Sequence, residues 1–250
     1  MTQQKIALVT GANKGIGYAI AEQLSTAHGI TVLLGARDPD LGARAALALR
    51  AQGGDVHEIT LDVTRAASVK DAAALIGAQY GRLDILVNNA GISGNRDAQR
   101  PGTVELDNVR AVFETNLFGV IAVTEAMLPL LRESAPARIV NVSSGTGSLT
   151  WMTDPDHYFA SIVAGSAAYP VSKTALNMLT VQYAKALAAQ DITVNAIAPG
   201  PCATDFVGGI TGRVFTRTAA DGARIAVELA TSADGTRTGG FYDDDGQVPW

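Results

Sequence analysis

Short runs of consecutive apolar residues alternate along this chain with longer segments in which apolar residues recur at helical spacing. The runs with the length and β-branched content of buried strands are Ile6–Thr10, Thr31–Leu34, Val56–Leu61, Ile85–Val87, Ile139–Val142 and Ile192–Ile197. The Ala- and Leu-rich segments between them are Ile16–Ala27, Leu41–Ala51, Ala66–Tyr80 and Ala167–Ala188. Strands that are apolar throughout are buried on both faces, as in parallel sheets covered by helices. The pattern therefore predicts an α/β fold, a Rossmann-type doubly wound parallel sheet flanked by helices.

Composition and charge narrow this prediction without changing it. No linker or repeat divides the 250 residues, so we expect a single domain over residues 1–250. A net charge of −5 and scattered basic residues argue against a nucleic-acid partner. The most apolar long stretch, Leu117–Leu131, is interrupted by polar residues and Pro129, so no membrane span is expected. A single cysteine, Cys202, and a polar N-terminus that does not resemble a signal peptide suit the cytoplasm.

The connection between the first strand and the first helix is rich in glycine. It reads Thr10-Gly-Ala-Asn-Lys-Gly-Ile-Gly17. Glycines let a turn approach an anion closely, and the free N–H groups of a helix N-terminus attract phosphate. The spacing G-x-x-x-G-x-G is not the common dinucleotide fingerprint, G-x-G-x-x-G. Taken alone, this turn is either a phosphate site or a plain tight connection.

Four further groups of polar residues follow in order. Asn88-Asn-Ala-Gly91 ends the fourth strand run and Ser143-Ser144 ends the fifth; Tyr169 and Lys173 lie one turn apart on a helix, and Pro199-Gly-Pro-Cys-Ala-Thr204 follows the sixth run. Together with the glycine turn and Asn116 in a long helix, this set resembles the short-chain dehydrogenase/reductase family across essentially the whole chain. The glycine turn and the tail Gly239–Trp250 look most like its carbonyl-reductase-type branch.

The resemblance implies four catalytic residues. Tyr169 would donate a proton to a carbonyl oxygen, and we expect the neighbouring ammonium of Lys173 to lower the pKa of its phenol. Lys173 would also hold the nicotinamide ribose. Ser144, the second serine of its pair, would hydrogen-bond the same carbonyl oxygen. Asn116 would help hold a water that relays protons to the lysine.

The same resemblance implies the cofactor site. NAD has a free ribose 2′-hydroxyl that a carboxylate accepts, whereas the 2′-phosphate of NADP needs cations. Lys14 in the glycine turn and Arg37 after the second strand run supply two cations, and no carboxylate occurs there until Asp38. We therefore predict NADP(H) as the cofactor. The predicted cofactor-binding residues are Gly11, Asn13, Lys14, Gly15, Ile16, Gly17, Arg37, Asp62, Val63, Asn89, Ala90, Gly91, Tyr169, Lys173, Pro199, Gly200 and Thr204.

Two segments are expected to shape the substrate site. Ser144 and Tyr169 are 25 positions apart, more than the common family pattern, with an insertion at about 150–164 that contains several aromatic residues. Its Trp151 would line a pocket with Ser144 and Tyr169, or would simply pack the loop down. The other segment is a substrate loop at about 201–217, where Cys202 is either a reactive thiol or a small filler residue. Insertions at this point in the branch cover an assembly surface of tetrameric relatives, which favours a monomer or dimer.

These residues predict an NADPH-dependent oxidoreductase that reduces the carbonyl of a small ketone, aldehyde or quinone. His28, His57 and His157 lack metal-ligand spacing, so no metal is expected. Two alternatives stay open. One is a non-catalytic NADP-binding sensor or scaffold on the same fold, and the other is an extended-type epimerase or dehydratase.

Overall fold

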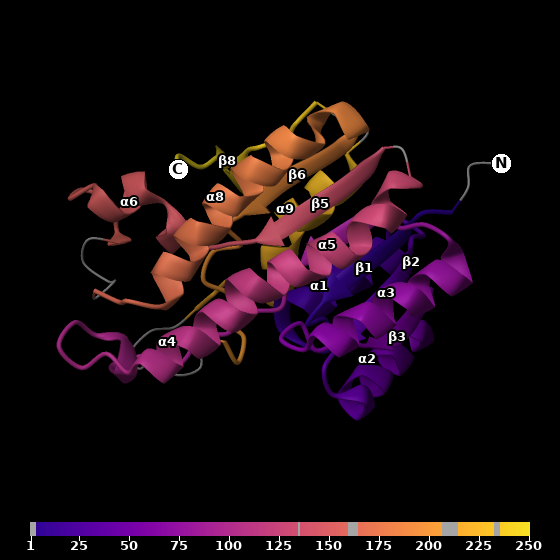
Figure 1. The fold of residues 1–250 in the computed structure, drawn as a ribbon, viewed down its shortest axis with the longest axis horizontal. Coiled ribbons are helices and arrows are strands. Elements are labelled where there is room, and N and C mark those ends of the chain that lie inside the picture. The colour runs from indigo at the N-terminus through magenta and orange to yellow at the C-terminus, as the bar shows by residue number, and fades with distance from the viewer. Residues whose placement is uncertain (1–3, 135, 160–164, 207–214, 233–235) are drawn as a thin grey trace.

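The computed structural model describes residues 4–134, 136–159, 165–206, 215–232 and 236–250. A central sheet lies between two layers of helices (Figure 1). The sheet order is β3-β2-β1-β4-β5-β6-β7-β8, in which every neighbouring pair is parallel except β7 and β8. The order reverses between β1 and β4, which is where a doubly wound sheet opens a crevice for a ligand.

The strands are β1 (Ile6–Thr10), β2 (Thr31–Ala36), β3 (Val56–Thr60), β4 (Ile85–Asn88), β5 (Ala137–Val142), β6 (Ile192–Ile197), β7 (Phe241–Asp243) and β8 (Gly246–Gln247). Every residue of β1, β2, β4, β5 and β6 is buried, as expected for strands covered on both faces. The six predicted strands are confirmed with bounds that differ by at most two residues. The short strands β7 and β8 were not predicted, because three and two residues carry no readable period.

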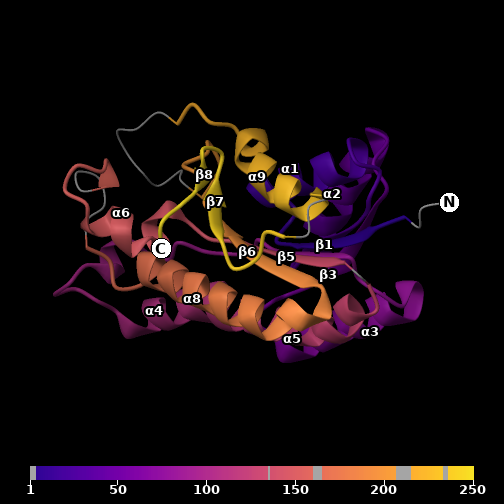
Figure 2. The same ribbon diagram turned by 90° about the horizontal axis from the view of Figure 1, so that it is seen from above.

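Two helical layers cover the sheet (Figure 2). One layer holds α1 (Gly15–Thr26), α2 (Pro39–Ala51) and α9 (Ala219–Thr231), and the other holds α3 (Ala66–Tyr80), α4 (Leu106–Phe113), α5 (Gly119–Arg132) and α8 (Tyr169–Leu187). A short helix, α6 (Leu149–Thr153), lies at one end of the molecule. Each layer buries its own apolar cluster against the sheet, so the two cores are separated by the strands themselves. The predicted Rossmann-type fold with a single domain is confirmed.

Helices α4 and α5 form one continuous rod, joined by a π-helical turn at Glu114–Phe118. By length and composition alone, the stretch Leu106–Arg132 would be long and apolar enough to cross a membrane. In the fold, however, α5 packs against α3 and against β4 and β5, which is the position of a core helix. Five large apolar residues of α5 therefore face the protein interior, whereas Leu106 and Phe118, in the part of the stretch before α5, are exposed.

Candidate active site

The glycine turn and the end of β4 pack directly against each other. Gly11 has a φ of +62°, and a Cβ there would lie 2.9 Å from Cα of Ala90. A Cβ on Gly17 would collide with the amide of Asn89, which donates hydrogen bonds to the carbonyls of Thr10 (2.9 Å) and Gly11 (3.1 Å). Two motifs almost 80 residues apart are thus joined through contacts that only glycines allow.

The N-terminus of α1 has no side-chain cap. Its N-cap position is Lys14, whose side chain makes no capping hydrogen bond. Its neighbour Gly15 has a φ of +60°, and the methyl of Thr204 lies 3.7 Å from where a Cβ would stand. Uncapped N–H groups and the positive end of the helix dipole suit an anionic group. The predicted residues Gly11, Gly15, Gly17 and Thr204 therefore lie together at the start of α1.

The two predicted phosphate-binding cations have different environments. Nζ of Lys14 lies 2.9 Å from Oδ2 of Asp205, and both side chains are exposed. Arg37 is exposed at the end of β2, and no ion pair joins it to a carboxylate within the described ranges. Asp38, the nearest acid, caps α2 by accepting a hydrogen bond from the backbone N–H of Leu41 (3.0 Å). The acid after β2 is thus committed to a helix cap, and the ion pair of Lys14 with Asp205 was not predicted.

Asp62 and Val63 follow β3 as predicted. The carboxylate of Asp62 accepts hydrogen bonds from both the backbone N–H (3.0 Å) and the hydroxyl (2.7 Å) of Thr64. Val63 is 8% exposed and packs against Gly119 at the start of α5, where a Cβ would lie 2.9 Å from its side chain. This turn therefore links the edge of the sheet to the helix that carries Asn116.

Asn116 lies in the π-helical turn and is fully buried. Its amide binds the backbone of Ile92 on both sides, accepting from the N–H (2.9 Å) and donating to the carbonyl (3.0 Å), and it also donates to the hydroxyl of Ser172 (3.1 Å). A Cβ on Gly91 would lie 3.4 Å from Oδ1 of Asn116 and 3.7 Å from Nζ of Lys173. The π-turn thus brings a buried amide next to the buried lysine, at a type of helix defect that often occurs in functional sites.

Lys173 is 4% exposed, and its ammonium donates a hydrogen bond to the carbonyl of Val142 (2.8 Å). It lies 5.7 Å from the ring centroid of Tyr169, one helical turn earlier. Burial lowers the pKa of Lys173 to about 8. Lys173 remains mostly protonated at neutral pH.

The pKa of the Tyr169 phenol is raised, whereas the sequence analysis predicted that it is lowered. Burial raises its pKa to about 12, while a hydrogen bond from Ser144 and the charge of Arg96 act in the opposite direction. The expectation that Lys173 lowers this pKa is wrong for the chain without a nucleotide, because loss of water around the phenol outweighs the nearby charges. Tyr169 is therefore a protonated donor at neutral pH, and Arg96 is a site residue that no sequence pattern indicated.

Ser144 follows β5 and caps a 3-10 turn at Gly145–Gly147. Its hydroxyl lies 3.0 Å from the hydroxyl of Thr146. The ring of Trp151, from α6, lies 3.0 Å from where a Cβ on Gly145 would stand, and it stacks on His157 with centroids 4.9 Å apart. Trp151 thus lies against Gly145, the residue after the serine, and packs the described part of the insertion. Residues 160–164 of that insertion are outside the described residues.

The turn after β6 is held in place by Arg217, which lies at the C-terminal end of the predicted substrate loop. Gly200 has a φ of +72° and lies against Arg217, whose guanidinium donates to the carbonyl of Pro199 (3.2 Å) and pairs with Asp244 at 2.6 Å. Cys202 is 2% exposed and burial raises the pKa of its thiol, which favours the filler interpretation. Arg217 was not recognised in the sequence because its partners lie 18 and 27 positions away. Positions 207–214 of the predicted loop are outside the described residues.

Comparison with known proteins decides the family. Residues 5–214 match the family described as short chain dehydrogenase. The chain belongs to the short-chain dehydrogenase family. A short-chain dehydrogenase named anuI from Penicillium roqueforti is 36% identical over 96% of this chain and 94% of its own length. Salutaridine reductase from Papaver bracteatum is 32% identical over 97% of this chain and 95% of its own length.

Solved structures agree with this assignment. An NADPH-bound carbonyl reductase from chicken fatty liver has a TM-score of 0.83 and 30% identity, covering 99% of this chain and 100% of that protein. This short-chain dehydrogenase thus has carbonyl-reductase-like relatives, as its glycine turn and tail predicted. The matched structures include complexes with NADP or NADPH and also one with NADH, so the family alone does not choose the nucleotide.

Proposed function

We propose that this protein is an NADPH-dependent reductase that converts the carbonyl group of a small ketone, aldehyde or quinone into an alcohol. The observation that carries the proposal is the convergence of Ser144, Tyr169 and Lys173, in a fold whose helix α1 also begins without a side-chain cap. All three follow or flank the carboxyl ends of β5 and β6, at the edge of the sheet where doubly wound folds bind ligands. Two relatives that match nearly the whole chain are named as reductases.

The residues present fit a dinucleotide. Gly11 and Gly17 let the turn pack closely against Ala90 and Asn89, where a Cβ would collide, and Gly15, with a φ of +60°, leads into a helix start without a side-chain cap. A Cβ on Gly91 would lie 3.7 Å from Nζ of Lys173, so the chain after β4 lies next to this buried ammonium. Lys14 and Arg37 would hold the 2′-phosphate, and Lys173 would hold the nicotinamide ribose. Bound NADPH supplies the hydride for the reduction.

The protein's own part in the reaction is proton transfer and charge stabilisation. Tyr169 donates the proton of its phenol to the carbonyl oxygen, and its high pKa keeps that proton in place until the oxygen gains negative charge. Ser144 donates a hydrogen bond to the same oxygen. The ammonium of Lys173, 5.7 Å from the ring of Tyr169, stabilises the phenolate that remains. Asn116 fixes the backbone of Ile92 beside Lys173 and so supports the geometry of this exchange.

A direct test measures NADPH oxidation against a panel of ketones, aldehydes and quinones. In the Tyr169→Phe variant we expect turnover to fall by a factor on the order of 10² or more, because the ring stays and the proton is lost. NADPH affinity, measured by calorimetry, should be nearly unchanged. Near-normal turnover in this variant would exclude Tyr169 as the donor, and a parent protein that binds NADPH but reduces none of the panel would favour the sensor alternative.

We also propose that the protein is cytoplasmic and acts on a small molecule, without a nucleic-acid or membrane partner. The insertion at about 150–164 is the basis for proposing a monomer or dimer, because insertions at this point in the branch cover an assembly surface of tetrameric relatives. Light scattering in dilute solution tests this assembly state. A stable tetramer would contradict it.

A further inference from the structure

The first turn of α8 has no cap from its own neighbours. Ala168, at the N-cap position, has an irregular backbone (φ −122°, ψ −75°) and no side-chain hydrogen bond to the helix. The first helical residue is Tyr169, the proposed proton donor, and the second is proline, which has no N–H. Helix N-termini normally expose their first N–H groups unless a side chain accepts from them. Tyr169 is thus the first residue of a helix whose N-terminus is not capped by the residue before it.

Gln99 supplies the missing acceptor from 70 residues away. Its Oε1 accepts hydrogen bonds from the backbone N–H of Tyr169 (3.0 Å) and from the hydroxyl of Ser166 (2.7 Å). Its backbone carbonyl accepts a third, from the N–H of Ala167 (2.9 Å). Gln99 therefore binds three of the four residues from Ser166 to Tyr169, the segment that leads into α8.

The other end of the same amide is bound to the loop after β4. Nε2 of Gln99 donates to the carbonyls of Ser93 (2.6 Å) and Asn95 (3.1 Å). Both acceptor positions and both donor hydrogens of the side chain are used, and the residue is 2% exposed. Since a backbone N–H only donates and a carbonyl only accepts, no carboxylate or apolar side chain could make both sets of bonds. The position requires an amide.

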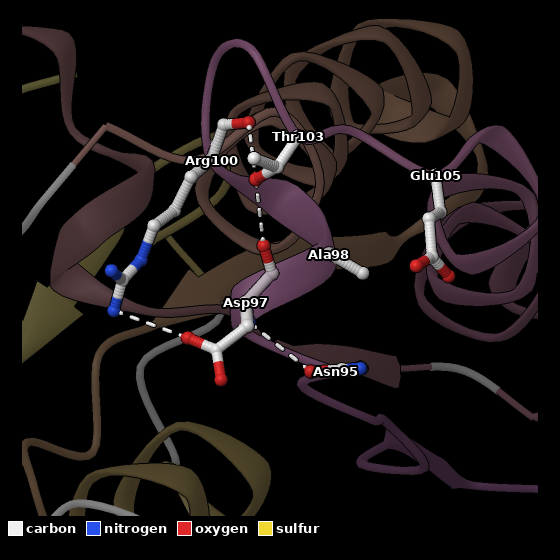
Figure 3. A pocket seen from close by; sticks show the side chains of 6 residues that line it. All are labelled: Asn95, Asp97, Ala98, Arg100, Thr103 and Glu105. Carbon is white, nitrogen blue, oxygen red and sulfur yellow. Dashed lines mark hydrogen bonds and ion pairs between the residues drawn. The ribbon is translucent and has the colours of Figure 1, made fainter.

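Residues close to Gln99 in the sequence lie on the opposite, outer side of the loop. Asp97 and Arg100 form an ion pair at 3.2 Å on the outer side of the loop, where they line an open cavity of about 450 Å³ (Figure 3). Gly94 makes room for the inward turn, because it has a φ of +67° and a Cβ there would lie 3.0 Å from Nε2 of Gln99. The loop therefore has one face exposed to solvent and one buried side chain that reaches the start of α8.

We propose that Gln99 is a positioning residue for the reduction: it caps α8 across the fold and thereby fixes Tyr169 relative to Ser144 and Lys173. This inference extends the proposed function, on which its kinetic test rests. A hydrogen-bond donor displaced by about 1 Å can lose on the order of 100-fold in rate, so a small shift of the first turn matters.

The test compares Gln99→Met with a matched control. Methionine keeps the length and volume but makes none of the four side-chain bonds. Asn108→Ala is the control, because the Asn108 amide binds the N–H (2.8 Å) and carbonyl (3.1 Å) of Asn95 in the same loop, and none of its bonds reaches α8. For Gln99→Met we expect kcat to fall by roughly 10- to 100-fold with an unchanged KM for NADPH and a shifted pH profile. For Asn108→Ala we expect kcat and the pH profile to stay near those of the parent.

Amide hydrogen exchange gives a second measurement that does not depend on catalysis. The N–H of Tyr169 should be protected in the parent and in Asn108→Ala, although it is the first residue of a helix. It should exchange rapidly in Gln99→Met. Rapid exchange in the parent would overturn the proposal even if Gln99→Met did not fold, and so would a folded Gln99→Met with parental kcat. If kcat fell equally in Gln99→Met and Asn108→Ala, the loss would come from a general disturbance of the loop. The proposal that Gln99 caps α8 would then be wrong. A protein that reduced no carbonyl would still show the predicted exchange pattern, so failure of the two proposals can be told apart.

Discussion

Replacing Lys173 by methionine should make the nucleotide-free protein more stable at neutral pH while abolishing its turnover. Lys173 is 4% exposed, and burial is the cause that lowers its pKa to about 8. An unfolded lysine has a pKa of about 10.4, so the native state holds this proton less tightly by more than 2 pKa units. At about 1.4 kcal/mol per unit, the buried charge destabilises the fold by roughly 3 kcal/mol at pH 7.

Methionine removes that penalty but leaves the carbonyl of Val142 without its hydrogen bond. Losing one such bond costs about 1 kcal/mol, so the net gain at pH 7 should be about 2 kcal/mol. Between pH 8 and about 10.4 the unfolded parent binds more protons than the native parent, so the stability of the parent rises with pH in that window. The advantage of the variant should therefore shrink by about 2 kcal/mol between about pH 7 and 10.

Urea denaturation followed by tryptophan fluorescence measures this gap at several pH values. Lys185→Met is a suitable control, because Lys185 lies on the same helix and is exposed. Its effect on stability should not change with pH. A gap between Lys173→Met and the parent that stays constant from neutral to alkaline pH would refute the reasoning, because it would mean that Lys173 is not buried as a charged group. A confirmed gap would identify this lysine as a residue that is retained for activity at the expense of stability.

Two further predictions concern charged residues, one set near the predicted 2′-phosphate position and the other near Tyr169. Lys14→Ala and Arg37→Ala should each weaken NADPH binding by roughly 10-fold or more without changing NADH binding, whereas Asp205→Asn, which releases Lys14 from its ion pair, should strengthen NADPH binding. The ratio of kcat/KM for NADPH and NADH checks this, and a parental ratio near one would contradict NADP preference. Arg96→Ala should raise the pKa of Tyr169 further, which makes the phenol a weaker acid and should lower kcat at neutral pH, while Arg96→Lys should not. Parental kcat in Arg96→Ala would show that this charge does not reach the phenol.

The layered fold and the family could be predicted from the sequence because both depend on residues that are close together along the chain. Buried parallel strands such as Ile6–Thr10 are apolar throughout, and amphipathic helices repeat with their own period, so each element is visible without its neighbours. The glycine turn and the Tyr169–Lys173 pair are equally local, since one depends on backbone freedom and the other on a single helical turn. Such motifs can be identified without knowing which distant segments pack against them.

The environment of those residues was decided by the tertiary structure alone. Gln99 meets Tyr169 over 70 positions and Lys14 meets Asp205 over 191, and no periodic pattern links residues at such separations. The pKa of Tyr169 was wrongly predicted for the same reason, because the sequence displays the neighbouring lysine but not the burial that outweighs it. Desolvation and cross-fold hydrogen bonds arise only when distant segments pack together, so the chemistry of this site depends on contacts that the order of residues does not reveal.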